Sequence, residues 1–404
     1  MNAKKIMMLS LAVMMTGTTL LYANGGASAA FADQSNRTLV AKKHTTEVSA
    51  TSKQTQAAIK KLMDGAIKQG VPGMIIQTQH NGAKWEYATG KSNIVANHKM
   101  QPNFHFRIGS ITKTFTATVV LQLVGEGKLS LDDSVEKWLP GVVQGNGYDG
   151  NKITVRQLLN HTSGIANYSD AEHFMKRSFE QPLKSYSARG HVKSGLKEKP
   201  LFEPGTKFSY SNTNYVLAGL IIEKVTGDTY AGQITERLIK PLGLKNTLVP
   251  GTSSKLPEPH ARNYYSAKDK SLRDITELNP TVAGASGEMV STADDLNRFF
   301  TKLLAGHLLK PEQMKEMLDT VEVAPGLRYG LGIKEIKLSN GVKVWGHSGG
   351  IHGALSHTVG TLGGKKMLTI SNNYFTAGQL THRSEVISKL HAQIPSLVFD
   401  SSKK

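Results

Sequence analysis

The chain has 404 residues, enough to bury one large core or two smaller ones, and 39% of them are hydrophobic and 20% charged, as in ordinary globular proteins. It contains no cysteine, which excludes disulfides, cysteine-ligated metals, a cysteine nucleophile and a lipid anchor attached through cysteine. The formal net charge is +18, so an anionic partner has to be considered.

The basic residues are scattered along the chain and do not alternate with aromatic residues, which argues against a nucleic-acid partner. A modest cluster comprises Lys184, Arg189, Lys193, Lys197 and Lys199. We interpret the charge as a solvated basic surface. The alternative is electrostatic retention on an anionic cell wall.

The first 32 residues have the pattern of a secretory signal peptide. Lys4 and Lys5 precede an apolar run over residues 6–15, and small residues then end in two Ala-x-Ala sequences. We expect cleavage after Ala32, with Ala29 as the alternative. Residues 33–52 are polar and predict a flexible lead-in, and no later segment has 18 unbroken apolar residues. The sequence therefore predicts an exported protein, secreted or associated with the cell wall, without a membrane anchor.

Three elements are predicted before the middle of the chain. Apolar residues at helical spacing predict a helix over 52–68. The apolar runs 74–78 and 85–88 flank Asn81-Gly82, which predicts a hairpin. An apolar helix is expected over 114–126, closed by Gly127. Residues 119–285 then show mainly helical patterns and long loops.

The C-terminal part changes to short β-rich runs. These cover 329–336, 342–345, 354–359 and 367–370, and Asn340-Gly341, Gly349-Gly350 and Gly363-Gly364 are expected to separate them. A last helix is expected over 378–392. We therefore predict a discontinuous α+β sheet domain, 53–118 plus 286–395, with a mainly helical insert domain over 119–285.

The histidine pattern does not indicate a metal site. There is no H-E-x-x-H or H-x-x-E-H, and His347, His352 and His357 recur every five residues, which matches neither a helix face nor a strand face. No Gly-rich phosphate-binding motif is present either. We expect neither a metal nor a cofactor.

Two patterns could supply a nucleophilic serine. Residues 346–350 spell G-x-S-x-G around Ser348, but a Gly-rich, β-like segment follows instead of the required helix. The pattern S-x-x-K occurs at Ser110, Ser134, Ser194 and Ser401, and only Ser110 opens a strongly apolar helix. Lys113 returns to the same helix face, and burial would favour its neutral form, which could accept the serine proton. The alternative is that Ser110 is only a helix N-cap.

Three motifs occur in the order typical of a known family. They are Ser110-Ile111-Thr112-Lys113, Tyr210-Ser211-Asn212 and His347-Ser348-Gly349. The sequence resembles the penicillin-recognising serine enzymes, namely class C β-lactamases and low-molecular-weight D-alanyl-D-alanine carboxypeptidases. Histidine in the third motif is more similar to the Streptomyces-type carboxypeptidases and their D-peptidase and esterase relatives. Further similarity at 158–164, 202–227, 287–296 and 329–332 extends the resemblance to roughly residues 55–390.

The resemblance implies a β-lactamase/DD-peptidase-like α+β fold, an antiparallel sheet flanked by N- and C-terminal helices. It implies that Ser110 is the nucleophile and that Lys113 and Tyr210 share the proton transfers, either of them being the base. It further implies an oxyanion between the N–H groups of Ser110 and Gly350, and a substrate strand along the segment that begins at His347. The residues implied in substrate binding are Asn212, His347, Ser348, Gly349, Gly350 and Lys334.

For three of these residues the resemblance implies a more precise role. His347 and Ser348 would face the substrate carboxylate or orient Tyr210. Lys334, on the preceding strand, is the candidate cation for that carboxylate. The alternative for Lys334 is an ordinary exposed lysine on an edge strand.

The function implied is a secreted D-alanyl-D-alanine carboxypeptidase acting on cell-wall peptides through an acyl-serine intermediate. Its partners would be peptides that contain D-amino acids, with penicillins as candidate inhibitors. A D-stereospecific peptidase or esterase of the same fold is the alternative. A β-lactamase or a non-catalytic wall-binding protein is less favoured.

Overall fold

The computed structural model describes residues 51–171, 173–376 and 381–400. The predicted signal peptide and most of the lead-in lie outside these residues. The helices are α2 Lys53–Lys68, α3 Thr112–Gly125, α4 Val135–Trp138, α5 Val155–Leu159, α6 Phe174–Glu180, α7 Ala188–Gly195, α8 Asn212–Thr226, α9 Tyr230–Ile234, α10 Lys240–Leu242, α11 Ala293–Leu304, α12 Pro311–Leu318 and α13 His382–Val398. The short helical turns are η1 Gly109–Ile111, η2 Gly150–Lys152, η3 Tyr168–Asp170, η4 Thr235–Ile239, η5 Pro280–Val282 and η6 Gly284–Ser286.

The strands are short except in the central sheet. They are β1 Gly73–His80, β2 Ala83–Asn93, β3 His98–Lys99, β4 Phe106–Arg107, β5 Gln144–Gly145, β6 Tyr148–Asp149, β7 Tyr264–Ser266, β8 Leu272–Asp274, β9 Val290–Ser291, β10 Val321–Ala324, β11 Leu327–Tyr329, β12 Lys334–Lys337, β13 Lys343–Ile351, β14 Ala354–Gly360 and β15 Lys366–Asn372.

Nine strands form one sheet in the order β10-β11-β12-β13-β14-β15-β1-β2-β3. Every neighbouring pair is antiparallel. Strand β1 lies between β15 and β2, so it joins the N-terminal strands to the C-terminal ones. The predicted α+β fold with an antiparallel sheet is therefore confirmed.

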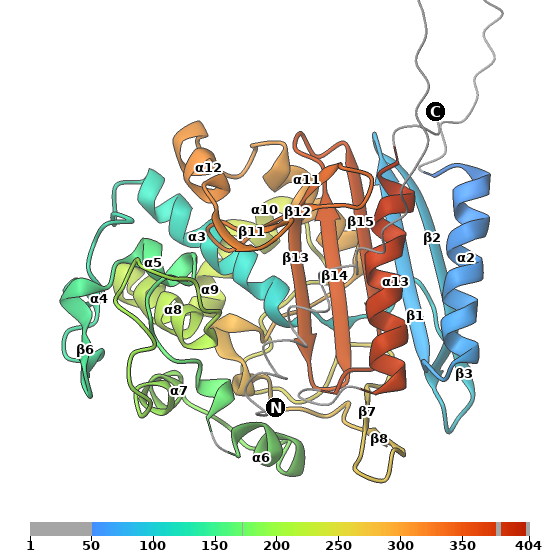
Figure 1. The fold of residues 1–404 in the computed structure, drawn as a ribbon, viewed down its shortest axis with the longest axis horizontal. Coiled ribbons are helices and arrows are strands. Elements are labelled where there is room, and N and C mark those ends of the chain that lie inside the picture. Colours follow the sequence, from blue (N-terminus) through green and yellow to red (C-terminus); the bar gives the residue numbers. More distant parts are fainter. Residues whose placement is uncertain (1–50, 172, 377–380, 401–404) are drawn as a thin grey trace, which may run out of the picture.

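Helices cover both faces of this sheet. The N-terminal helix α2 and the C-terminal helix α13 pack side by side on one face (Figure 1). Between them and the sheet lies a core that includes Ile59, Met63, Leu390 and Ile394. On the other face α11 packs against β1, β14 and β15, and a second, larger core continues from there into the helical part of the chain.

Helix α3 connects the sheet to the helical part. All but three of its 14 residues are buried, because it contacts α8, α9 and α12 as well as β13. Its buried threonines are satisfied internally, and Thr114, for example, donates to the carbonyl of Gly332 at 2.7 Å. The predicted domain boundary at residue 118 falls within this helix.

Several predicted elements match the structure closely. The first helix is α2, and the first hairpin turns at Asn81 and Gly82, whose φ angles are +49° and +87°. Positive φ at both positions is what a tight two-residue hairpin requires. Strands β14 and β15 cover the predicted runs 354–359 and 367–370.

Three predicted boundaries were wrong. The run 329–336 is two strands, because the chain turns at Gly332, where an added Cβ would lie 2.5 Å from the Cβ of Ala117 on α3. Gly349-Gly350 is not a break, since β13 continues through it to Ile351. The last helix α13 extends to Val398, six residues beyond the predicted end, although Pro395 lies within it.

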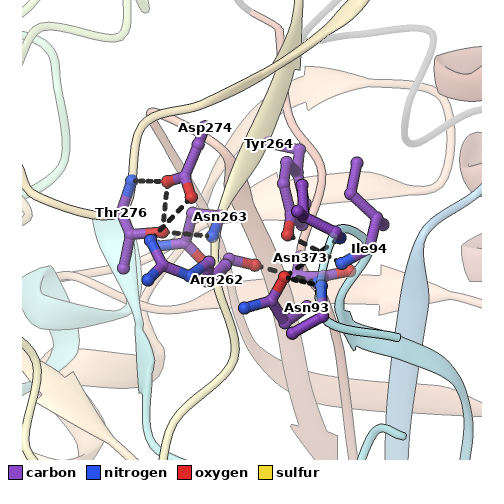
Figure 2. A network of polar contacts seen from close by, with 10 residues as sticks. Asn93, Ile94, Arg262, Asn263, Tyr264, Asp274, Thr276 and Asn373 are labelled. Carbon is purple, nitrogen blue, oxygen red and sulfur yellow. Dashed lines mark hydrogen bonds and ion pairs between the residues drawn. The ribbon is translucent and has the colours of Figure 1, made fainter. Parts of the chain in front are cut away.

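A polar network connects residues 262–264 to the sheet region around β2 and the end of β15 (Figure 2). The side chain of Asn373 donates to the carbonyls of Arg262 and Lys91 at 2.9 and 3.1 Å. The hydroxyl of Tyr264 accepts from the backbone N–H of Ile94 at 3.0 Å. Within the described residues, no helix is both long and apolar enough to span a membrane.

Candidate active site

Ser110 lies at the point where the sheet meets α3. It belongs to the helical turn η1, immediately before α3, and the N-cap of α3 is Ile111. Its Oγ accepts a hydrogen bond from Lys113 Nζ at 3.1 Å. The alternative that Ser110 is only an N-cap of this helix is therefore wrong.

Lys113 is completely buried and has three polar partners. Besides Ser110, its Nζ donates to Asn212 Oδ1 at 2.7 Å and to the carbonyl of Ser286 at 2.6 Å. Burial, and next the positive charge of Lys334, hold the pKa of Lys113 well below its usual range. A neutral amine has two N–H donors and one lone pair. It would keep the bonds to Asn212 and Ser286 and accept the third from the Ser110 hydroxyl.

The second motif is held by the loop that precedes α6. Asn212 is the first residue of α8, and its side-chain Nδ2 donates to Ser169 Oγ at 3.2 Å while its Oδ1 accepts from Lys113. Its backbone N–H donates to Asn167 Oδ1 at 3.0 Å. The amide is therefore fixed in one orientation against the lysine.

Tyr210 lies beside both catalytic candidates. Lys113 Nζ is 5.0 Å from the centre of its ring. Burial raises the pKa of Tyr210, and a hydrogen bond with the Ser110 side chain opposes that shift only in part. This shift favours the protonated phenol, in contrast to the phenolate that a neighbouring cation would favour.

His347 is a buried residue of β13. Its Nδ1 lies 2.6 Å from the carbonyl oxygen of Ser348 and must donate to it, so Nε2 of the neutral ring accepts from the Tyr329 hydroxyl at 2.9 Å. Burial, followed by the charges of Lys334 and Lys113, keeps the pKa of His347 well below its usual range. The ring of Tyr329 in turn lies 6.1 Å from that of Tyr210.

Lys334 is paired with β13 and is only 5% exposed. It lies opposite Gly346, and its Nζ donates to Ser348 Oγ at 2.9 Å. The alternative of an exposed edge-strand lysine is therefore wrong. Burial lowers the pKa of Lys334 to about 7, so its charge changes near neutral pH.

Two glycines allow β13 to touch the serine turn. An added Cβ at Gly349 would lie 1.8 Å from the carbonyl oxygen of Ile108 and 2.8 Å from the backbone nitrogen of Ser110. An added Cβ at Gly109, whose φ is +49°, would lie 2.9 Å from the nitrogen of Gly350. The N–H groups of Ser110 and Gly350 thus belong to backbones in direct contact, as a shared oxyanion site requires.

The strand edge beside this contact is open toward β12. The pairing of β12 with β13 runs from Lys337↔Lys343 to Lys334↔Gly346. Among the described strands, none pairs with residues 347–351 on that side. An extended peptide could therefore add there as a further strand.

The substitution Gly349→Ala should lower kcat/KM for acyl transfer by about 100-fold or more. The new methyl group would force the Ile108–Ser110 backbone away and misalign an oxyanion donor, a loss typically worth that much. Gly65→Ala is the control, because no atom lies within 4 Å of its added Cβ in α2. Steady-state kinetics on both variants checks this. Equal activity of Gly349→Ala and the unmodified protein would contradict it.

Some residues at the site had no role assigned from the sequence. His161 is buried with φ +62°, its Nδ1 accepts from the backbone N–H of Ser211 at 3.2 Å, and its ring lies 4.2 Å from that of Tyr210. Ser169 and the carbonyl of Ser286 complete the contacts of Asn212 and Lys113. The segments 158–164 and 329–332 carried the resemblance, but spacing alone could not show that His161 and Tyr329 support Tyr210 and His347.

The described residues contain no group of three or more His, Asp or Glu side chains placed to hold a metal ion. The functional groups that the structure brings together are a hydroxyl, two buried lysines, a phenol and an amide. This set can carry out nucleophilic acyl transfer with proton exchange.

Comparison with known proteins agrees with this chemistry. The family model described as Beta-lactamase matches residues 55–365. The structure is similar to a D-stereospecific amidohydrolase from Streptomyces sp., with 44% identity, a TM-score of 0.76 and coverage of 82% of this chain and 97% of that one. Penicillin-binding protein 4 of Amycolatopsis lactamdurans is 28% identical over 309 residues, 71% of this chain and 77% of that protein.

Protein flp of Staphylococcus aureus strain MW2 is 31% identical over 255 residues, which are 61% of this chain. The match spans about half of that longer relative, 48% of its length. Since the family model covers most of the sequence and the fold agrees, the chain belongs to the Beta-lactamase family of serine hydrolases, together with penicillin-binding proteins and D-stereospecific amidohydrolases.

Proposed function

We propose that this chain is an exported D-stereospecific serine amidohydrolase that cleaves the amide bond after a D-residue through an ester of Ser110. The observation that carries the chemistry is the buried amine of Lys113, 3.1 Å from Ser110 Oγ. The similarity to a D-stereospecific amidohydrolase supports the choice of substrate. The N-terminal pattern of residues 1–32 supports export.

Acylation begins at Ser110. As its Oγ bonds to the scissile carbonyl carbon, its proton passes to the neutral Nζ of Lys113. The carbonyl oxygen becomes an oxyanion between the N–H groups of Ser110 and Gly350. These donors are part of the resting backbone, so little reorganisation is needed when the charge develops.

Tyr210 then serves as the general acid. Its phenol keeps its proton because burial raises its pKa, and it lies next to Ser110, where the leaving nitrogen departs. Transfer of this proton to the amine breaks the C–N bond, and the proton on Lys113 can restore the phenol. A water molecule attacks the ester in the reverse sequence, releasing the acid and regenerating Ser110.

A D-alanyl-D-alanine carboxypeptidase is the narrower candidate within this function. It is favoured by Lys334, whose ammonium group is held at Ser348 on the strand beside the oxyanion site. A substrate that ends in a free carboxylate and pairs with this edge would bring that group toward Ser348 and Lys334. Cell-wall peptides ending in D-alanine have this chemistry.

The test uses intact mass and a stereochemical pair of substrates. The protein and its Ser110→Ala variant are incubated with a penicillin, and then with matched D- and L-alanine amides and a peptide ending in D-Ala-D-Ala. We expect hydrolysis of the D-substrates alone and a penicillin adduct of one drug mass that the variant lacks. Fast hydrolysis of the penicillin without D-substrate turnover would replace the proposal with a β-lactamase. Acylation of the variant would remove Ser110 from the mechanism.

A further inference from the structure

A cationic surface lies beside the active site on the segment 173–207, which we call the α6–α7 rim. It contains eight Lys or Arg residues and three Glu residues. Its net charge of +5 in 35 residues is more than a quarter of the +18 of the whole chain. Figure 1 shows α6 and α7 together along the lower edge of the molecule, below α8.

The rim cations are exposed and almost all lack acidic partners. Lys176 pairs with Glu180 at 3.6 Å, and it is the only rim cation with an ion pair among the described residues. Arg177, Lys184, Arg189, Lys193, Lys197, Lys199 and Lys207 are all exposed. On and beside the nearby β7–β8 hairpin, Arg262 pairs with Asp274 and Arg273 with Asp269, whereas the exposed Lys268 and Lys270 have no ion pair among the described residues.

Three of these cations form a row. Arg189, Lys193 and Lys197 are spaced four residues apart along α7 and its C-terminal extension, where Leu196 keeps a helical backbone. Like charges at this spacing lie on one helix face and destabilise the helix. Lys197 lies just beyond the C-cap Leu196. An anion bound along the row would relieve the repulsion between these charges.

The rim also adjoins the site. Helix α7 packs on α8, where an added Cβ at Gly195 would lie 2.6 Å from Thr213 Oγ1, next to Asn212. The cations are spread along the surface and do not converge on a pocket, so a single small anion would not satisfy them. A linear polymer with regularly spaced negative charges would.

We propose that the α6–α7 rim binds a linear polyanion whose phosphate groups repeat along the chain without bases, as in polyphosphate. The bases of a nucleic acid are not part of the recognition, because the row presents cations without aromatic side chains between them. The binding is electrostatic and weakens as salt screens the charges. It does not depend on the reaction at Ser110.

The test measures binding of the full chain to long-chain inorganic polyphosphate at two salt concentrations. The rim variant carries Arg189→Glu, Lys193→Glu and Lys197→Glu. The matched control carries Lys53→Glu, Lys61→Glu and Lys99→Glu, three exposed lysines on α2 and β3 that change the net charge equally. We expect the control to bind like the unmodified protein and the rim variant to bind at least about tenfold more weakly, with a flatter salt dependence.

Thermal unfolding, which requires no activity, shows that both variants are folded, and turnover of a small amide then reports the active site separately. Equal weakening by both variants would reduce the effect to net charge and overturn the proposal. Binding to single-stranded DNA but not to polyphosphate would overturn it in favour of nucleic acid. Binding only to vesicles of anionic lipid would overturn it in favour of a membrane surface.

Discussion

The substitution Lys113→Met should slow acylation strongly while the fold persists, lowering kcat/KM for amide substrates by about 100- to 10,000-fold. Lys113 is the only side chain whose nitrogen reaches Ser110 Oγ at hydrogen-bond distance among the described residues, and its lowered pKa leaves the amine ready to take the proton. Methionine has a similar length and fills the same buried space, but it cannot accept a proton. The measurement is the rate of penicillin adduct formation together with steady-state kinetics.

The substitution Tyr210→Phe tests whether Lys113 is the general base and Tyr210 the general acid. Loss of the phenol should impair amide cleavage, because an amine needs a proton to leave, whereas an ester with an acidic alcohol leaving group does not. On such an ester we expect Tyr210→Phe to recover most of its acylation rate, measured as the first release of the alcohol, and Lys113→Met to remain slow in the same step. If the two variants responded in the opposite way, Tyr210 would be the base.

The activity should therefore rise with pH until Lys113 is neutral. The amine is protonated below its pKa and cannot accept the Ser110 proton there. Since burial and Lys334 hold that pKa well below the usual range, the rising limb lies far below the pH at which an ordinary lysine loses its proton.

Local patterns were sufficient to predict several elements of the fold, among them the helix that carries Lys113. The Asn-Gly turn at 81–82 and the apolar helix α3 depend on neighbouring residues only, and both occur as expected. The three motifs predicted which residues would meet, and the hydrogen bonds from Lys113 to Ser110 and Asn212 show that two of them do.

Properties that depend on pairing between distant segments were not predictable. Gly349 and Gly350 look like a turn in the sequence, yet they lie within a strand because β13 pairs with β14 through them, and the backbone of Ile108–Ser110 passes against Gly349. The raised pKa of Tyr210 also depends on elements that are distant in the sequence and pack around it. No local spacing encodes this burial, so the sequence left the choice of base open.

The burial of Lys334 also results from pairing between distant segments. It leads to the second prediction, which concerns recognition of a substrate carboxylate. Lys334 faces Ser348 because the register of β12 on β13 places it opposite Gly346. Replacing it with methionine should reduce kcat/KM for a peptide ending in a free D-alanine carboxylate by about 10- to 100-fold, the usual value of a hydrogen bond to a charged group. The same peptide with a C-terminal amide should be cleaved at an unchanged rate.

The pH dependence distinguishes a role of the Lys334 charge from a purely structural role of this side chain. Lys334 is charged below its pKa of about 7 and neutral above it, so binding of the carboxylate should weaken as the pH rises through that region. A bound carboxylate favours the charged form of Lys334 and therefore raises its pKa in the complex. The pH profile to measure is that of kcat/KM, because it reports the pKa values of the free enzyme. The amide-terminated peptide should lack this falling limb.

Lys334→Arg is the conservative control, because the guanidinium group stays charged throughout the range. It should retain the preference for the carboxylate and move the falling limb out of the neutral region, whereas Lys334→Met should lose both. An identical loss on carboxylate and amide peptides would assign Lys334 a structural role only. In that case the carboxypeptidase hypothesis would be rejected. The broader proposal of a D-stereospecific amidohydrolase would then be supported by Ser110 and Lys113 alone.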